Sequence, residues 1–130
     1  TYTGDLTFSI WFNTDTVNPA NDGIFYIGDF NSQGALQVNI YNNNIIFRAN
    51  GGVGSKQFSF TDTTSWHNLT CVYLAGDRAN SKLYLDGVLQ TTSDGGSFPS
   101  SLSLTVSILF KKTTIAGTPT CLAKRICSLV

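Results

Sequence analysis

The sequence has no glutamate and no methionine, and it contains a single histidine. All eight acidic residues are aspartates, and charged residues make up only 12% of the 130 residues, against roughly 25% in an average globular protein. Because the formal net charge is zero, no long-range field draws the chain toward nucleic acid or an anionic membrane. No apolar run approaches the ~18 residues of a membrane-spanning helix. We therefore expect no nucleic-acid partner and no membrane insertion.

The missing glutamate and the lone histidine also count against catalysis. Acid–base hydrolysis of a glycoside needs two carboxyl groups that flank the glycosidic bond. No predicted strand carries two aspartates at positions i and i+2, which would lie on the same face of the strand. As a general base, His67 would need a nucleophile and an orienting group, and as a metal ligand it would need further ligands. We expect His67 instead to be a structural strand residue, hydrogen-bonded across the sheet, and we expect no catalytic residues.

The odd number of cysteines excludes a closed disulfide framework within one chain. Cys71 lies in a strand pattern and is expected to be a buried small hydrophobic residue. A bridge between Cys121 and Cys127 fits their spacing but has no other support. Since methionine is absent and residue 1 is threonine, we expect the chain to have been processed or cut from a larger parent protein.

The dominant pattern is an alternation of apolar and polar residues, which is typical of half-buried antiparallel strands. In the first run the alternation puts Trp11 on the face opposite the apolar residues Leu6, Phe8, Ile10 and Phe12. No segment sustains a helical period. Further strands are predicted over residues 23–29, 34–41, 45–48, 56–60, 66–73 and 103–110, and a hairpin is predicted over residues 82–89. Many short strands separated by turns indicate an all-β sandwich or barrel.

Turn signals separate these strands. The run Asn42-Asn43-Asn44 predicts a tight hairpin, because asparagine tolerates a positive φ. Asp86-Gly87, between alternating apolar residues, is a strong hairpin signal. Residues 51–55 and 92–97 are rich in glycine and serine and are predicted to be loops.

Two segments resemble a known family. The first is Leu6-Thr7-Phe8-Ser9-Ile10-Trp11-Phe12, and the second is Trp66-His67 with a strand ending at Tyr73, followed by Leu83-Tyr84-Leu85-Asp86-Gly87. Together they resemble the laminin-G-like branch of the concanavalin A-like lectin/glucanase superfamily, over residues 4–89. The resemblance implies an antiparallel two-sheet jelly-roll sandwich. The family's glucanases use a strand with paired carboxylates, including glutamates, which this chain cannot provide.

The resemblance also implies that the chain lacks the family's first and last strands. We assign residues 1–101 to the sandwich and residues 102–130 to an atypical basic segment. After Asp94 there is no acidic residue, whereas four basic residues follow it: Lys111, Lys112, Lys124 and Arg125. A tail, a linker and out-of-frame sequence are all compatible with this shift in composition.

Few residues stand out as site candidates. Trp11 is the candidate ligand-binding residue, since it would line a groove if its face of the sheet is concave. Trp66 opens a family motif and is expected to anchor the core. Some relatives bind calcium on rim loops, which makes Asp22, Asp29 and Asp77 weak metal candidates, although calcium wants six to eight oxygens. We expect these aspartates to be solvated or to cap turns, and we expect no cofactor. The sequon Asn68-Leu69-Thr70 lies within a strand and is read as coincidental.

The resemblance favours a non-catalytic, lectin-like recognition or adhesion module of an extracellular, cell-surface or virion protein. It would bind glycan or protein through its concave sheet or the loops at one rim. The alternative is a structural or assembly domain of a phage-like or surface protein, with no small ligand.

Overall fold

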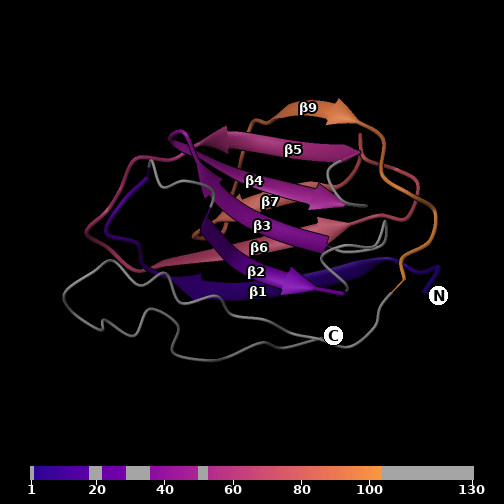
Figure 1. Cartoon of the computed structure of the whole chain (residues 1–130), viewed down its shortest axis with the longest axis horizontal. Helices are drawn as coiled ribbons and strands as arrows, with labels where there is room; N and C mark the ends of the chain where they lie inside the picture. Colours follow the sequence, from indigo (N-terminus) through magenta and orange to yellow (C-terminus); the bar gives the residue numbers. More distant parts are fainter. Residues whose placement is uncertain (1, 18–21, 29–35, 50–52, 104–130) are drawn as a thin grey trace.

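The computed structural model describes residues 2–17, 22–28, 36–49 and 53–103, which form two stacked antiparallel sheets (Figure 1). One sheet has four strands in the order β1-β6-β7-β8, and the other has five in the order β2-β3-β4-β5-β9. The strands are β1 Leu6–Phe12, β2 Asp22–Ile27, β3 Leu36–Tyr41, β4 Asn44–Ala49, β5 Gly54–Ser59, β6 His67–Tyr73, β7 Lys82–Leu85, β8 Val88–Leu89 and β9 Ser93–Gly96. Within the described ranges, no helix is long and apolar enough to span a membrane.

The core fills the space between the two sheets and follows the alternation of the sequence. In β1 the buried side chains are Phe8, Ile10 and Phe12, and in β3 they are Leu36, Val38 and Ile40. The rings of Phe8 and Phe25 stack at a centroid distance of 4.3 Å, which joins the first strands of the two sheets. Cys71 is fully buried with a free thiol, as predicted. The predicted inward faces of these strands are therefore confirmed.

Both predicted hairpin turns are present. Asn42 and Asn43 adopt φ values of 49° and 59° between β3 and β4, and Asp86 and Gly87 adopt 50° and 79° between β7 and β8. Positive φ at both central residues defines a type I′ turn, whose twist matches that of paired strands. These two dipeptides therefore fix the register of their hairpins.

The predicted loop over residues 92–97 is wrong, because it contains strand β9, which pairs with β5. The predicted loop over residues 51–55 also overlaps a strand, since β5 begins at Gly54. Gly96 has a φ of 62°, and a Cβ there would overlap the Val53 carbonyl oxygen. Close backbone approach, and not side-chain propensity, therefore creates this edge strand.

An ion pair between a buried lysine and a partly exposed aspartate fastens β9 to β5. Lys56 points inward and is only 4% exposed. Its Nζ donates to Asp94 Oδ2 at 2.7 Å and to the Arg78 carbonyl oxygen at 3.0 Å. Lys56 thereby joins β5, β9 and the turn after β6, at one margin of the sandwich.

The two ends of the described chain lie side by side (Figure 1). Tyr2 and Leu102 form an isolated antiparallel bridge, with an N–H donated to a carbonyl oxygen at 2.7 Å in each direction. Leu102 is fully buried in the core. The end of the sandwich was predicted from the sequence one residue earlier, at residue 101. The predicted strand beyond residue 103, Cys121, Cys127 and the basic residues after 110 lie outside the described residues.

Candidate ligand-binding site

The two tryptophans lie outside the core. Trp11 is 48% exposed on the outward side of the four-stranded sheet, and Trp66 is 47% exposed just before β6. The expectation that Trp66 anchors the core is wrong. In β6 the buried positions are the odd-numbered Leu69, Cys71 and Tyr73, so the period of two turns Trp66 outward.

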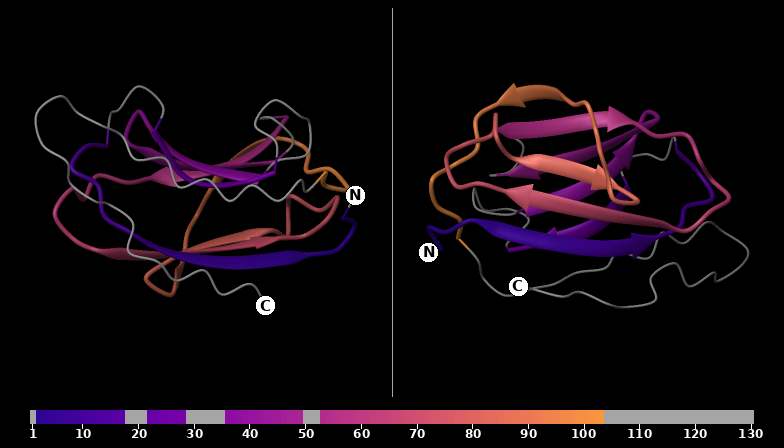
Figure 2. Two further views of the ribbon diagram at one scale, coloured as in Figure 1. Left: turned by 60° about the horizontal axis from the view of Figure 1, so that its bottom comes forward. Right: turned by 180° about the vertical axis from the view of Figure 1, so that it is seen from behind.

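The face that carries Trp11 is convex. Figure 2 shows in its left view that both sheets curve the same way, so that the five-stranded sheet presents the concave outer face. The condition under which Trp11 would line a groove is therefore not met. Beside Trp11, the side chains of Ser9, Asn68 and Thr70 bond to one another at 2.9–3.3 Å. These contacts engage both the amide group and the carbonyl oxygen of the Asn68 sequon.

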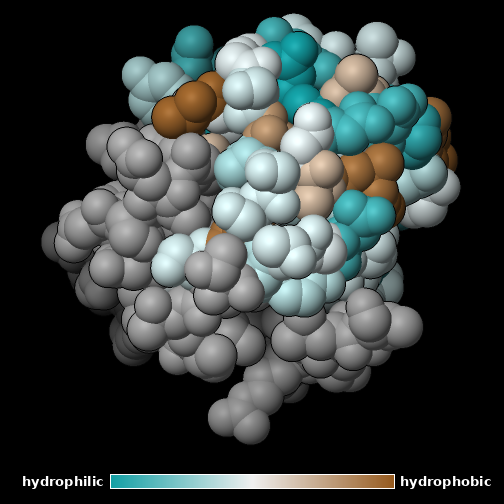
Figure 3. Space-filling model, turned by 90° about the vertical axis from the view of Figure 1, so that its right-hand side faces the viewer, coloured by the Kyte–Doolittle hydropathy of each residue, from teal (hydrophilic) through white to brown (hydrophobic). Residues whose placement is uncertain are grey.

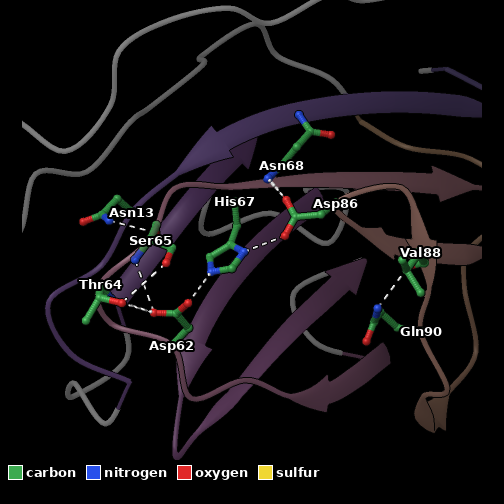
Figure 4. Close-up of polar contacts among 9 residues, drawn as sticks. All are labelled: Asn13, Asp62, Thr64, Ser65, His67, Asn68, Asp86, Val88 and Gln90. Atoms are coloured by element: carbon green, nitrogen blue, oxygen red, sulfur yellow. Dashed lines mark hydrogen bonds and ion pairs between the residues drawn. The ribbon is translucent and has the colours of Figure 1, made fainter.

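His67 is held between two aspartates (Figure 4). Its Nδ1 lies 2.7 Å from Asp86 Oδ2, and its Nε2 lies 3.2 Å from Asp62 Oδ2. The ring packs against Phe12 and Phe60 at centroid distances of 5.9 and 5.1 Å. Asp86 belongs to the neighbouring hairpin, so the predicted hydrogen bond across the sheet is confirmed. We call His67, Asp62 and Asp86 the histidine clamp.

The electrostatics of the histidine clamp favour its fully charged form. Burial alone would lower the pKa of His67, but the hydrogen bonds to Asp86 and Asp62 outweigh burial and raise that pKa above its ordinary value. The N–H and hydroxyl of Thr64 lower the pKa of Asp62, while His67 and the N–H of Asn68 lower that of Asp86. Because carboxylates occupy both ring nitrogens, neither is available as a general base, and the clamp is suited to joining a loop to a hairpin.

The three metal candidates do not assemble into a site that the structure describes. Asp77 accepts hydrogen bonds from the backbone N–H and side-chain amide of Asn80 at 3.0 and 2.8 Å, which is a turn-capping role. These bonds lower the pKa of Asp77. Asp29 and the side chain of Asp22 lie outside the described residues. Among the residues that are described, no group of three or more His, Cys, Asp or Glu could hold a metal ion.

The concave face of the five-stranded sheet carries side chains that sequence reasoning passed over. Alternation turns Gln37 and Asn39 outward from β3, and Ile46 and Arg48 outward from β4, since their neighbours belong to the core. The register sets Gln37 between Tyr26 of β2 and Arg48 of β4. Arg48 lies next to Ser55 of β5. Ile46 lies next to Gln57 of β5, which in turn lies next to Ser93 of β9. The face is thus lined by amides, hydroxyls and one guanidinium, together with the side chains of Ile46 and Tyr26.

Gln37 is the most informative residue of this concave face. It is only 7% exposed, yet its side-chain amide has no hydrogen-bond partner among the described residues. The amide atoms themselves are not among the fully buried polar atoms that lack a partner, so water or a ligand can make their hydrogen bonds. The sequence does show polar residues at the outward positions of two predicted strands. It does not show that these residues are buried, because their burial depends on how the sheet curves.

The outer surface elsewhere is mixed in character. Figure 3 shows hydrophobic residues in small separate patches among polar ones on the end of the molecule that it faces. Small patches of this kind are ordinary on soluble surfaces. Among the described residues visible at that end, no extended apolar surface is seen.

The family model described as the concanavalin A-like lectin/glucanases superfamily matches residues 1–112. The chain belongs to this superfamily. Among solved structures it is similar to the mouse laminin alpha1 chain, domains LG4-5, with a TM-score of 0.60 and 14% sequence identity. The match covers 98% of this chain and 34% of that one, so the chain spans about a third of the laminin chain. No curated protein matches it.

Membership confirms the predicted resemblance and the antiparallel sandwich. Laminin-G-like domains of this superfamily are typically non-catalytic binding modules, and they usually occur in extracellular proteins. Membership in the family therefore indicates this general role and no particular ligand. The ligand has to be inferred from the side chains of this chain.

Proposed function

We propose that the domain is a non-catalytic recognition module of a larger extracellular, cell-surface or virion protein, and that it binds a glycan on its concave sheet. The observation that carries this proposal is the amide of Gln37, which makes no hydrogen bond to the described residues although the residue is only 7% exposed on the concave face. A sugar hydroxyl can both donate to and accept from such an amide, which would supply the missing hydrogen bonds.

The composition of the concave face supports the same ligand. Apart from the guanidinium of Arg48, the polar groups that the central strands β3, β4 and β5 present on this face are neutral amides and hydroxyls. Side chains on central strands are held more precisely than those on loops, and preorganised groups lose less entropy on binding. Tyr26 adds an aromatic ring beside Gln37, and aromatic rings pack well against the apolar faces of sugars.

The test is a glycan array probed with the full chain, followed by titration of a bound glycan. We expect Gln37→Ala to weaken binding about tenfold, which corresponds to one or two lost hydrogen bonds. Trp11→Ala is the matched control on the convex face and should leave the affinity unchanged. The reverse pattern would move the site to Trp11, and an absence of glycan binding would remove the proposal.

Calcium enters the same experiment as a variable. We propose that glycan binding needs no cofactor, because Asp77, the one described metal candidate, already accepts two hydrogen bonds. Titrations in calcium and in EDTA should therefore give the same affinity. Loss of binding in EDTA would contradict this part of the proposal.

The alternative role as a structural or assembly domain is favoured by one observation. Large hydrophobic residues are exposed on the side of the four-stranded sheet: Trp11, Trp66, Val88 and Leu89. A neighbouring domain or chain could cover them. Sedimentation of the full chain would then show association that Leu89→Ser weakens, whereas a strictly monomeric chain would count against assembly through this face.

A further inference from the structure

One motif of the chain lies outside the proposed binding site, the sequon Asn68-Leu69-Thr70. It is the single Asn-X-Ser/Thr sequence among the 130 residues. In β6 the period of two buries Leu69 and turns Asn68 and Thr70 outward, where both are partly exposed. The two side chains therefore lie on the convex face of the four-stranded sheet, on the opposite side of the molecule from the concave face.

The position of the sequon within a strand does not prevent its modification. Oligosaccharide is transferred to the unfolded chain in the secretory pathway, so the folded domain has only to leave room for it at the surface. Asn68 Nδ2 donates to Ser9 Oγ at 2.9 Å, its one hydrogen bond to a described residue. Because an amide nitrogen carries two hydrogens, a sugar can replace one of them while the other is kept for Ser9.

Trp11 supplies an aromatic surface beside Asn68. The two residues are directly opposite each other in the register of β1 and β6, and the Cβ atoms of such partners lie about 4.5–5.5 Å apart. The Trp11 side chain is 48% exposed on the same convex face. Aromatic rings pack well against the apolar faces of sugars, so a sugar attached to Asn68 would cover the exposed indole.

Resting on the extracellular part of the proposed function, we propose that Asn68 is an N-glycosylation site and that the first sugar of its glycan packs on Trp11. The donor is a lipid-linked oligosaccharide diphosphate. The bond from sugar C1 to the diphosphate oxygen breaks, and Asn68 Nδ2 forms a new bond to C1. The diphosphate leaves with the bonding electron pair, and one Nδ2 proton is released. The Thr70 hydroxyl completes the sequon that the transfer requires.

The first test expresses the full chain behind an added signal peptide in a eukaryotic cell. The mass of the protein is measured in both cells and medium. We expect a glycan that peptide-N-glycosidase removes, with conversion of Asn68 to aspartate as the mark of the site. Thr70→Ser keeps the sequon and should keep the glycan, whereas Thr70→Val keeps a branched side chain and should lose it. A wild-type chain that carries no glycan in either fraction would overturn the inference.

The second test measures the packing on Trp11. The urea midpoint of the glycosylated chain is compared with that of the same chain from the bacterial cytoplasm, which carries no N-glycan. We expect the glycan to raise the midpoint, and we expect Trp11→Ala to remove this rise while Trp11→Phe retains part of it. No rise, or an equal rise in Trp11→Ala, would overturn the packing on Trp11.

The inference and the proposed function fail separately. Because the glycan of Asn68 lies on the convex face, a saccharide titrated onto the concave face should bind the glycosylated and the bacterial chain with equal affinity. If neither chain binds a saccharide, the proposed binding function fails while the glycan at Asn68 still stands. If saccharides bind and Asn68 carries no glycan, this inference alone fails.

Discussion

The ion pair between Lys56 and Asp94 gives the sharpest prediction about stability. The Asp94→Asn variant keeps the shape of the side chain and removes its charge. Lys56 then remains 4% exposed, with the Arg78 carbonyl oxygen at 3.0 Å as its other bond. Breaking a fully buried pair in this way costs about 3–5 kcal/mol. Because the side chain of Asp94 is 24% exposed, we expect a smaller cost, about 2–3 kcal/mol of unfolding free energy.

Equilibrium unfolding in urea measures this cost. With a slope of roughly 1–3 kcal/mol per molar urea, the midpoint should fall by about 0.7–3 M while the slope is unchanged. Asp15→Asn is the matched control, since Asp15 is exposed and outside any described ion pair. It should change the unfolding free energy by less than about 0.5 kcal/mol.

The double variant Lys56→Met with Asp94→Asn separates charge burial from packing. It removes the buried cation and keeps an apolar stem of similar length, so we expect it to recover most of the stability lost in Asp94→Asn. A loss below about 0.5 kcal/mol in Asp94→Asn would refute the reasoning. It would mean that water reaches Lys56 and that β9 does not depend on the pair.

Three further predictions concern the fold. The contribution of protonated His67 to the unfolding free energy is complete below its unfolded pKa of 6.5 and is lost as the pH rises through its raised folded pKa. The contribution of Asp62 and Asp86 is lost in acid, because their folded pKa values are lowered and protonation removes their charge. The gap in unfolding free energy between wild type and His67→Gln should therefore be largest near about pH 5 and shrink by about pH 9; a gap constant with pH would contradict the histidine clamp. Gly96→Ala should cost more than about 1 kcal/mol in urea unfolding, against little for Gly23→Ala, where no atom lies within 4 Å of the added Cβ; equal costs would argue against close approach at β9. Phe8→Ala should cost about 3–5 kcal/mol in thermal or urea unfolding, and a loss below about 1 kcal/mol would mean that the sheets repack.

Most of the sandwich could be predicted from the sequence because its strands alternate so regularly. The period of two in β1 and β3 separates core from surface, and the Asn-Asn and Asp-Gly dipeptides specify their turns without reference to distant residues. Strand β9 could not be predicted in this way. Its Ser-Asp-Gly-Gly sequence has poor strand propensity, and it forms through contacts with Lys56 and Val53, which lie roughly forty residues earlier in the chain.

The candidate site shows the same division. The outward positions of Gln37 and Arg48 follow from alternation alone, and so does the outward position of Trp66, where motif resemblance misled the prediction. Which sheet is concave depends on how the strands twist and stack. Trp11 was therefore the natural candidate from the sequence, although the hollow lies on the other sheet.

The strand order has a consequence for what can join this domain. At one margin the sheets end in β8, of two residues, and β9, of four that include two glycines. Such short, glycine-containing edges give an incoming strand little to pair with. At the opposite margin lie β1 and β2, of seven and six residues (Figure 1), and no described strand pairs with their outer sides. Among the described strands, the longer unpaired edges therefore lie at this second margin and the shorter ones at the first.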